Sequence, residues 1–221
     1  MVIRGSGTSV STTAILNTIA MAKQHEQKTR HLENMLKQQF GRVHMAIQIP
    51  QGGSSSLLAF IIAYIDHVPG FLDAARKISR AAGIEAYTTP CLKVAEDYFL
   101  KPPEIVCDHV GLDELMDEAY LAHRLMEEIN DRFMARAGTP LIPMDTTLSN
   151  LIIHNLIGEP FSNELDEAVH YSIEQVATKE NVYEKPAFKQ YLSALDPDEP
   201  GHWPCLMDQL TIKLQLNGLS I

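Results

Sequence analysis

The run LLAFIIAYI, residues 57–65, is the feature that most constrains how this chain can fold. It is the longest purely apolar stretch, and its nine residues are too few to cross a bilayer, which requires about 20. A helix that is apolar on every side must be covered on every side, so the run predicts a helix buried inside a larger fold. A serine of the preceding PQGGSSS segment caps this helix, expected over residues 55–67, and Pro69 stops or kinks it.

A second long helix is predicted from Thr12 to Phe40, because this segment has no glycine or proline and is rich in residues that favour helices. Its two ends are apolar, whereas its middle, KQHEQKTRH, is strongly polar. We therefore expect a helix that either crosses open solvent or breaks near Lys23.

Further helices follow from apolar residues that recur with the helical period between glycine, proline and capping residues. They are expected over residues 71–82, 89–100, 112–136, 146–157, 163–179 and 186–195. Gly83 and Gly158 occupy the stop positions of two of them. Thr89 caps another, which has Pro90 in its first turn. The sequence thus predicts an all-α protein, a multi-helix bundle of about eight helices.

A minor two-stranded β-ribbon is the one addition to this bundle that the pattern allows. VHMAIQI, residues 43–49, and LTIKLQL, residues 210–216, both alternate with the period of a strand. The second segment also fits a helix, which we favour. We expect residues 1–11 to form a flexible N-terminus and residues 12–221 to form a single helical domain.

The composition argues against several classes of partner. The formal net charge is −10, which disfavours nucleic acid and an anionic membrane surface, since both require a basic patch. Cys91, Cys107 and Cys205 form no CxxC pair, which argues against structural zinc and fits a reducing compartment. The N-terminus lacks the basic and apolar segments of a secretory signal. We therefore expect a soluble, cytoplasmic protein with no nucleic-acid or membrane partner.

The predicted helix 112–136 carries polar residues on its buried face. Because successive residues turn by about 100° around a helix, one apolar stripe comprises Leu112, Leu115, Met116, Ala119, Met126 and Phe133. His123 and Asn130 fall inside this stripe, and Tyr120 and Glu127 lie at its edge. Several acidic residues are predicted to face solvent: Asp113, Asp117, Glu118, Glu128 and Asp131. His123, Glu127 and Asn130 therefore form an inward polar seam.

Three roles fit this seam, because a buried polar group without a partner costs about 1–3 kcal/mol. The first is an internal hydrogen-bond network that fixes the helix register. The second is a site for a divalent transition metal, with His123 and Glu127 as ligands one turn apart and with His154 and Glu96 as further ligands. The third is a general acid/base pair for catalysis, in which Glu127 orients and polarises His123.

Other histidines have simpler interpretations. His154, on the narrow polar face of a very apolar helix, is either a satisfied core residue or lines a cavity shared with His123. His67 ends its predicted helix, where it would interact with the helix dipole. Glu167 and His170 have the ExxH spacing of di-iron bundles, but they lie opposite the apolar face of their helix and are expected to meet solvent.

Two classes of function fit these features. In the first, a soluble helical protein acts mainly through self-association or partner binding, most simply as a homo-oligomer, because its first helix has apolar ends that need cover. The alternative is a metal-dependent or acid/base enzyme, or a sensor of a small-molecule ligand, with an interhelical site around His123 and Glu127. The sequence contains no GxSxG, glycine-rich phosphate loop or HExxH motif that would favour a particular reaction.

Overall fold

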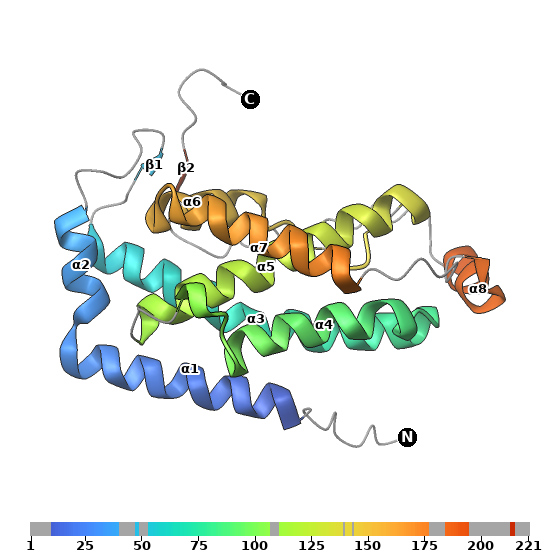
Figure 1. The fold of residues 1–221 in the computed structure, drawn as a ribbon, viewed down its shortest axis with the longest axis horizontal. Coiled ribbons are helices and arrows are strands. Elements are labelled where there is room, and N and C mark those ends of the chain that lie inside the picture. Colours follow the sequence, from blue (N-terminus) through green and yellow to red (C-terminus); the bar gives the residue numbers. More distant parts are fainter. Residues whose placement is uncertain are drawn as a thin grey trace.

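The computed structural model describes residues 10–39, 47–48, 53–106, 111–138, 140–142, 144–176, 184–194 and 213–214. Within them the chain forms eight α-helices that pack against one another, which confirms the predicted all-α class (Figure 1). The helices are α1 (Val10–Thr29), α2 (His31–Gln39), α3 (Ser54–Ala82), α4 (Glu85–Leu100), α5 (Leu112–Ala137), α6 (Thr147–Ile157), α7 (Phe161–Val176) and α8 (Pro186–Ala194). A 3₁₀ turn, η2 (Glu104–Val106), lies between α4 and α5.

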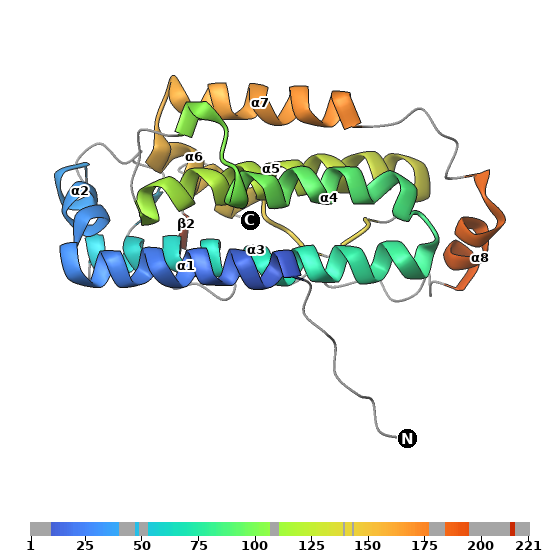
Figure 2. The same cartoon turned by 60° about the horizontal axis from the view of Figure 1, so that its bottom comes forward.

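α5 is the central helix of the bundle. It packs against α1, α3, α4, α6 and α7. In Figure 2, α1 and α3 lie on one side of α4 and α5, and α7 lies on the other side. One cluster of buried apolar side chains includes residues from all eight helices. α5 therefore has little free surface, and most of its polar residues need partners inside the fold.

α3 is a single helix of 29 residues that runs through Pro69, so the predicted stop after residue 67 is wrong. A proline inside a helix removes one backbone hydrogen bond and costs about 3 kcal/mol. Apolar side chains on both sides of Pro69 are buried, from Leu57 to Ala82, and we attribute the continuity of the helix to this burial. By length and composition α3 could also cross a membrane, but half of its most apolar window is buried in the bundle, and a core helix of a soluble protein meets the same criterion.

The apolar run at residues 57–65 is only partly enclosed, so its predicted burial on all sides is wrong. Leu57, Phe60 and Ile61 are buried, whereas Leu58 is half-buried and Ala59 is exposed. The reason is the position of α3, which lies in an outer layer of the bundle and keeps one side toward solvent (Figure 2).

The long N-terminal helix does break, but at Arg30 rather than near Lys23. Arg30 has a positive φ of 53°, which ends α1 and starts α2 in a new direction. The buried carboxylate of Glu26, in the last turns of α1, accepts hydrogen bonds from the backbone N–H groups of Leu32 at 2.9 Å and Glu33 at 3.0 Å. Glu26 thus caps the next helix and fixes the position of the break.

The turn between α3 and α4 explains a second shifted boundary. α3 ends at Gly83, as predicted, with a φ of 66°. A β-carbon at this position would also lie 2.9 Å from Ala187 of α8. The carbonyl of Ile84 then accepts the N–H groups of Tyr87 and Thr88, so α4 begins at Glu85 instead of after Thr89. Pro90 lies inside α4 and not in its first turn.

Two short strands connect distant parts of the chain. β1 (Ile47–Gln48) and β2 (Lys213–Leu214) pair antiparallel, with Ile47 opposite Leu214. Lys213 and Leu214 are therefore extended, where we favoured a helix. The other residues of the two alternating segments, together with residues 1–9 of the expected flexible N-terminus, lie outside the described residues.

The N-terminal half of α5 buries three acidic residues that were predicted to face solvent. Asp113 is 8 % exposed, Asp117 1 % and Glu118 2 %, so the prediction is wrong for these three. Glu128 is partly exposed and Asp131 is exposed, as predicted. The helical wheel assumed one buried face, but α1 and α4 cover the side of α5 that this assumption left to solvent.

We predict that Glu26→Ala destabilises the protein, because it leaves two N–H groups at the start of α2 without their carboxylate. The expected loss in the free energy of unfolding is about 1–2 kcal/mol. Urea denaturation of Glu26→Ala and of Gln27→Ala, an exposed neighbour on α1, provides the measurement. Similar losses for the two variants would contradict the capping role of Glu26.

Candidate functional site

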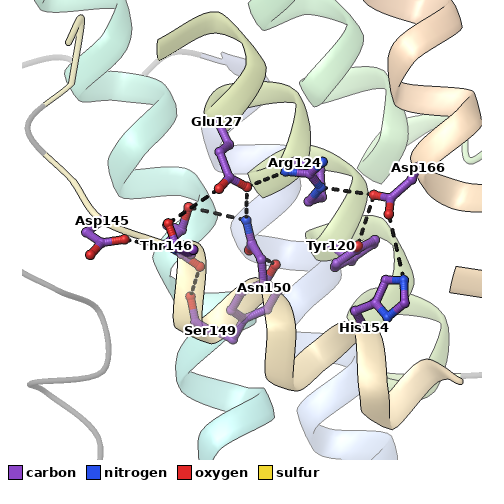
Figure 3. A network of polar contacts seen from close by, with 11 residues as sticks. Tyr120, Arg124, Glu127, Asp145, Thr146, Ser149, Asn150, His154 and Asp166 are labelled. Atoms are coloured by element: carbon purple, nitrogen blue, oxygen red, sulfur yellow. Dashed lines mark hydrogen bonds and ion pairs between the residues drawn. The ribbon is translucent and has the colours of Figure 1, made fainter. Parts of the chain in front are cut away.

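Side chains from α5, α6 and α7 line a surface pocket of about 270 Å³, which we call the α5–α6–α7 pocket. The described residues that line it are Tyr120, Arg124, Glu127, Thr147, Asn150, Leu151, His154 and Asp166. Figure 3 shows most of them joined by a continuous set of polar contacts.

The helical period brings these residues together. Tyr120, Arg124 and Glu127 lie on successive turns of α5 and share one side of it. Asn150 and His154 are one turn apart on α6 and project toward that side (Figure 3). Asp166 of α7 completes the set, so each of the three helices contributes at least one charged or titratable side chain to the pocket.

Arg124 lies between two carboxylates. Its Nη1 is 2.5 Å from Oε2 of Glu127, and its Nε is 2.9 Å from Oδ1 of Asp166. Burial opposes the charge of Arg124, but the two carboxylates raise the pKa of its guanidinium above its already high value. Tyr120 also donates a hydrogen bond to Oδ1 of Asp166, at 2.9 Å. Two carboxylates against one guanidinium leave the charged groups of the pocket one negative charge in excess.

Asn150 connects the pocket to the protein core. Its Nδ2 donates to Oε2 of Glu127 at 2.7 Å, and its Oδ1 accepts a hydrogen bond of 2.7 Å from the hydroxyl of Tyr64 on α3. Tyr64 is fully buried, and burial raises the pKa of its phenol well above 10, so this hydroxyl keeps its proton and acts as the donor. The side chain of Asn150 is therefore held at both ends.

Behind Tyr64 lies His123, enclosed by aromatic rings of α3. Its ring stacks on Tyr64 with 4.0 Å between ring centroids, and Phe71 meets it edge-on at 4.8 Å. The ring of His67 is nearly parallel to that of His123, at 14°, with centroids 5.6 Å apart, and its Nδ1 is 3.3 Å from Nε2 of His123. His123 is completely buried, which confirms its predicted inward position.

The contacts of His123 determine where its proton lies. Its Nδ1 is 2.8 Å from the carbonyl oxygen of Ala119, which can only accept, so Nδ1 carries the hydrogen. Burial lowers the pKa of His123 well below 6.5, and His67 lowers it further, although the bond to Ala119 acts in the opposite sense. In the neutral ring Nε2 is an acceptor, and His67 donates to it through Nδ1. The pKa of His67 is also lowered by burial.

The structure separates the four residues that the sequence groups as metal ligands. Glu127 and His154 line the same pocket, whereas His123 lies behind Tyr64 and is not among the described residues that line this pocket. Glu96 forms an ion pair with Arg76, between α4 and α3. Among the described residues, no group of three or more His, Cys, Asp and Glu side chains is arranged to hold a metal ion.

The two residues of the catalytic pair proposed from the sequence have different hydrogen-bond partners. The ring of His123 is oriented by the carbonyl of Ala119 and by His67, while Glu127 binds Arg124 and Asn150. The predicted polar seam thus divides into separate sets of contacts. His67 meets His123 instead of a helix end, because α3 continues beyond it.

Asn130, the third member of the seam, has a structural contact. Its amide exchanges two hydrogen bonds of 3.0 Å with the backbone of Ile142, in the segment that leads to α6. This pairing fastens the start of that segment to α5. Glu167 and His170, with their ExxH spacing, are exposed on α7, as predicted.

Sequence reasoning missed three residues that complete the site. Tyr64 lies within the apolar run 57–65, where nothing distinguishes it from a core residue. Asp166 flanks the buried face of α7 and belongs to no motif, although the ExxH spacing begins at the next residue. Arg124 was detectable in principle, since it is three positions from Glu127 on a helix and carries the opposite charge.

Comparison of the chain with protein-family models, with characterised proteins and with solved structures finds no match. Its function is therefore inferred from its own contacts. The feature with the clearest chemical content is the path from Glu127 in the pocket, through Asn150 and Tyr64, to His123 in the core.

We predict that His67 and His123 each contribute a loss of stability as the pH falls from 7 to 5. The pKa values of His67 and His123 are lowered in the folded state, so the unfolded chain binds protons first. The stability that their neutral forms contribute is present above pH 6.5 and is lost below it, by at most about 1.4 kcal/mol per pH unit for each histidine.

The variant His123→Phe tests the contribution of one ring, because it retains the aromatic packing and removes the titrating group. The contribution of His123 to the slope of the free energy of unfolding against pH should disappear. This contribution is at most about 1.4 kcal/mol per pH unit, which corresponds to one bound proton. His170→Phe, on the exposed side of α7, is the matched control and should keep the slope of the unmodified protein. A slope that His123→Phe leaves unchanged would show that this ring does not titrate on unfolding.

Proposed function

We propose that this compact helical protein binds a small zwitterion of the amino-acid type in the α5–α6–α7 pocket and transmits binding to its core. The observation that carries the proposal is the path of direct contacts from Glu127 through Asn150 and Tyr64 to His123. This proposal develops the small-ligand sensor that the sequence analysis gave as an alternative function. The binding site is now proposed at Glu127 and its hydrogen-bond partners. His123 acts as a responding residue in the core and does not touch the ligand.

The charges of the pocket support a ligand that carries both signs. Arg124 uses Nε and Nη1 for its two carboxylate partners, and a guanidinium has five N–H donors. Its Nη2 has no partner among the described residues and is suited to a ligand carboxylate. Glu127 and Asp166 offer carboxylate oxygens to a ligand ammonium group.

The size and rim of the pocket support a small ligand. A volume of about 270 Å³ lies just below the usual range of small-molecule sites, about 300–1,000 Å³. Leu151, which is 50 % exposed, lies at the rim beside these charged groups. An amino acid would place its charged groups on Arg124, Glu127 and Asp166, and an apolar side chain of the ligand would contact Leu151.

A bound ligand would affect the core because it competes with Asn150 for one carboxylate oxygen of Glu127. Asn150 and Arg124 already share Oε2 of Glu127, at 2.7 Å and 2.5 Å. A ligand ammonium at this oxygen would displace the amide of Asn150, which would lengthen the hydrogen bond from Tyr64. Because Tyr64 stacks on His123, the imidazole signals of His123 report on the state of the pocket.

We predict that at least one free α-amino acid, tested at millimolar concentration in thermal denaturation, raises the melting temperature. At a concentration tenfold above Kd the stabilisation should be about 1.4 kcal/mol. Arg124→Gln should abolish the rise, because it removes the guanidinium donors. Arg132→Gln, a partly exposed arginine on the same helix, should retain it.

Nuclear magnetic resonance distinguishes transmission from simple binding. The imidazole signals of His123 should move with the same ligand dependence as the melting temperature, and those of His170, on the exposed side of α7, should not. An amino-acid panel without any stabilising member, or a rise that survives in Arg124→Gln, would refute the proposed ligand class.

Self-association through α1 is a second candidate, and it was the first expectation from the sequence. Its supporting observation is that α1 exposes two large apolar side chains, Leu16 at 46 % and Met21 at 72 %. A second copy of the chain would cover them. This proposal does not depend on the α5–α6–α7 pocket.

We predict a mass above the 24.7 kDa monomer in light scattering at micromolar concentration. The double variant Leu16→Glu and Met21→Glu should lower this mass to that of the monomer, because it places charge on the contact. Leu151→Glu, which changes an exposed leucine on α6, is the control and should leave the mass unchanged. A monomeric mass for the unmodified protein would exclude self-association under these conditions.

A further inference from the structure

Glu118 is a buried carboxyl group without a full set of partners. It lies in the N-terminal half of α5, is 2 % exposed, and its Oε2 has no hydrogen-bond partner. An unpaired polar group in the interior costs free energy. Such a group in an otherwise well-packed helix points to a ligand or to a proton that the group retains.

A second pocket, of about 300 Å³, includes Glu118 in its lining. It lies between α1, α4 and α5 and is distinct from the α5–α6–α7 pocket. Its apolar part comes from Met21 and Ala22 of α1, Phe99 of α4 and Leu115 of α5. The pocket therefore combines apolar walls with one buried carboxyl group, which suits a molecule with an apolar body and one polar end.

The acidic residues around Glu118 favour a ligand whose polar end is positively charged. Glu114, one turn before it, also lines the pocket, and Asp117 is its buried neighbour in sequence. None of the described residues that line this pocket is a lysine or an arginine. A ligand anion would meet the like charge of Glu114 and Glu118 here, whereas a cation would find an acceptor in Oε2 of Glu118, to which no protein group donates a hydrogen bond.

From this arrangement we propose that the pocket between α1, α4 and α5 binds an organic ammonium ion with a short apolar body, and that Glu118 is its counter-ion. The ammonium group would donate hydrogen bonds to the carboxylate of Glu118. The carbon chain would lie against Met21, Phe99 and Leu115. This inference is independent of the proposed amino-acid site, because none of the described residues lines both pockets.

The proton on Glu118 gives this binding a characteristic pH dependence. Burial raises the pKa of Glu118 to about 9, and Glu114 and Asp117 raise it as well. The empty site is therefore protonated at neutral pH, and binding of an ammonium ion releases one proton from Glu118 to solvent. One released proton makes the affinity rise tenfold per pH unit below the pKa of Glu118.

Few other titratable groups among the described residues face Glu118, and the choice of pH keeps their contribution to the measured pH dependence small. On α5 they are Glu114 and Asp117, and across the pocket on α1 the titratable group is His25. From α4 the residue that faces the pocket is Phe99, which does not titrate. Measurements between pH 7.5 and 8.5 lie above the range in which imidazoles ordinarily titrate, about 6.5.

Isothermal titration calorimetry of the full chain with n-butylammonium chloride tests the proposal, with n-butanol as the uncharged control. We expect n-butylammonium to bind at least tenfold more tightly than n-butanol. Its affinity should rise by about eightfold from pH 7.5 to pH 8.5, given a pKa of about 9 for Glu118. Titrations in two buffers with different ionisation enthalpies should show release of one proton per bound cation.

Glu118→Gln is the decisive variant, because the amide has nearly the shape of the protonated acid and cannot become a counter-ion. It should lose the preference for n-butylammonium over n-butanol, together with the pH dependence and the proton release. Glu128→Gln, a partly exposed position on the same helix, should keep all three.

Three results would overturn the proposal. They are the absence of n-butylammonium binding, equal affinity for n-butylammonium and n-butanol, and retention of the preference in Glu118→Gln. If Glu118→Gln fails to fold, proton release in the unmodified protein decides, since a cation that binds elsewhere would not deprotonate Glu118.

Discussion

The enclosure of α5 by five neighbouring helices is the constraint on which the rest of the structure depends. α5 carries arginine, histidine, asparagine and several carboxylates, yet most of its N-terminal two thirds is buried. A buried polar group needs a partner inside the protein. Arg124 meets this need with Glu127 and Asp166, and Asn130 meets it with the backbone of Ile142. Among the described residues, Glu118 of α5 keeps its Oε2 without a hydrogen-bond partner.

These partnerships link the helices to one another as well as satisfying polar atoms. Arg124 joins α5 to α7, and Asn150 joins α6 to both α5 and α3. The side chain of Asn150 is 4 % exposed although Glu127, its partner, faces a pocket. Two hydrogen bonds of 2.7 Å and one ring stack therefore connect Glu127 at the pocket with Tyr64 and His123 in the core.

The candidate site was only partly predictable from the chain. A helical wheel placed His123 and Asn130 on the buried face of α5 and Glu127 at the edge of that face. The structure agrees with these positions, because they depend only on the period of one helix. The same wheel predicted wrongly that Asp117 and Glu118 face solvent, because it assumes that a helix has a single covered face. It also grouped His123 with Glu127, although their side chains leave α5 toward different neighbours.

By itself the sequence determined the helical class, the approximate extent of most helices and the end of α3 at Gly83, since propensity, period and capping act over a few residues. Only the tertiary structure decided that α3 continues through Pro69, that α1 breaks at Arg30 and that Tyr64 touches both Asn150 and His123. Those outcomes depend on contacts between residues far apart in the chain, and their energies appear only when the helices pack.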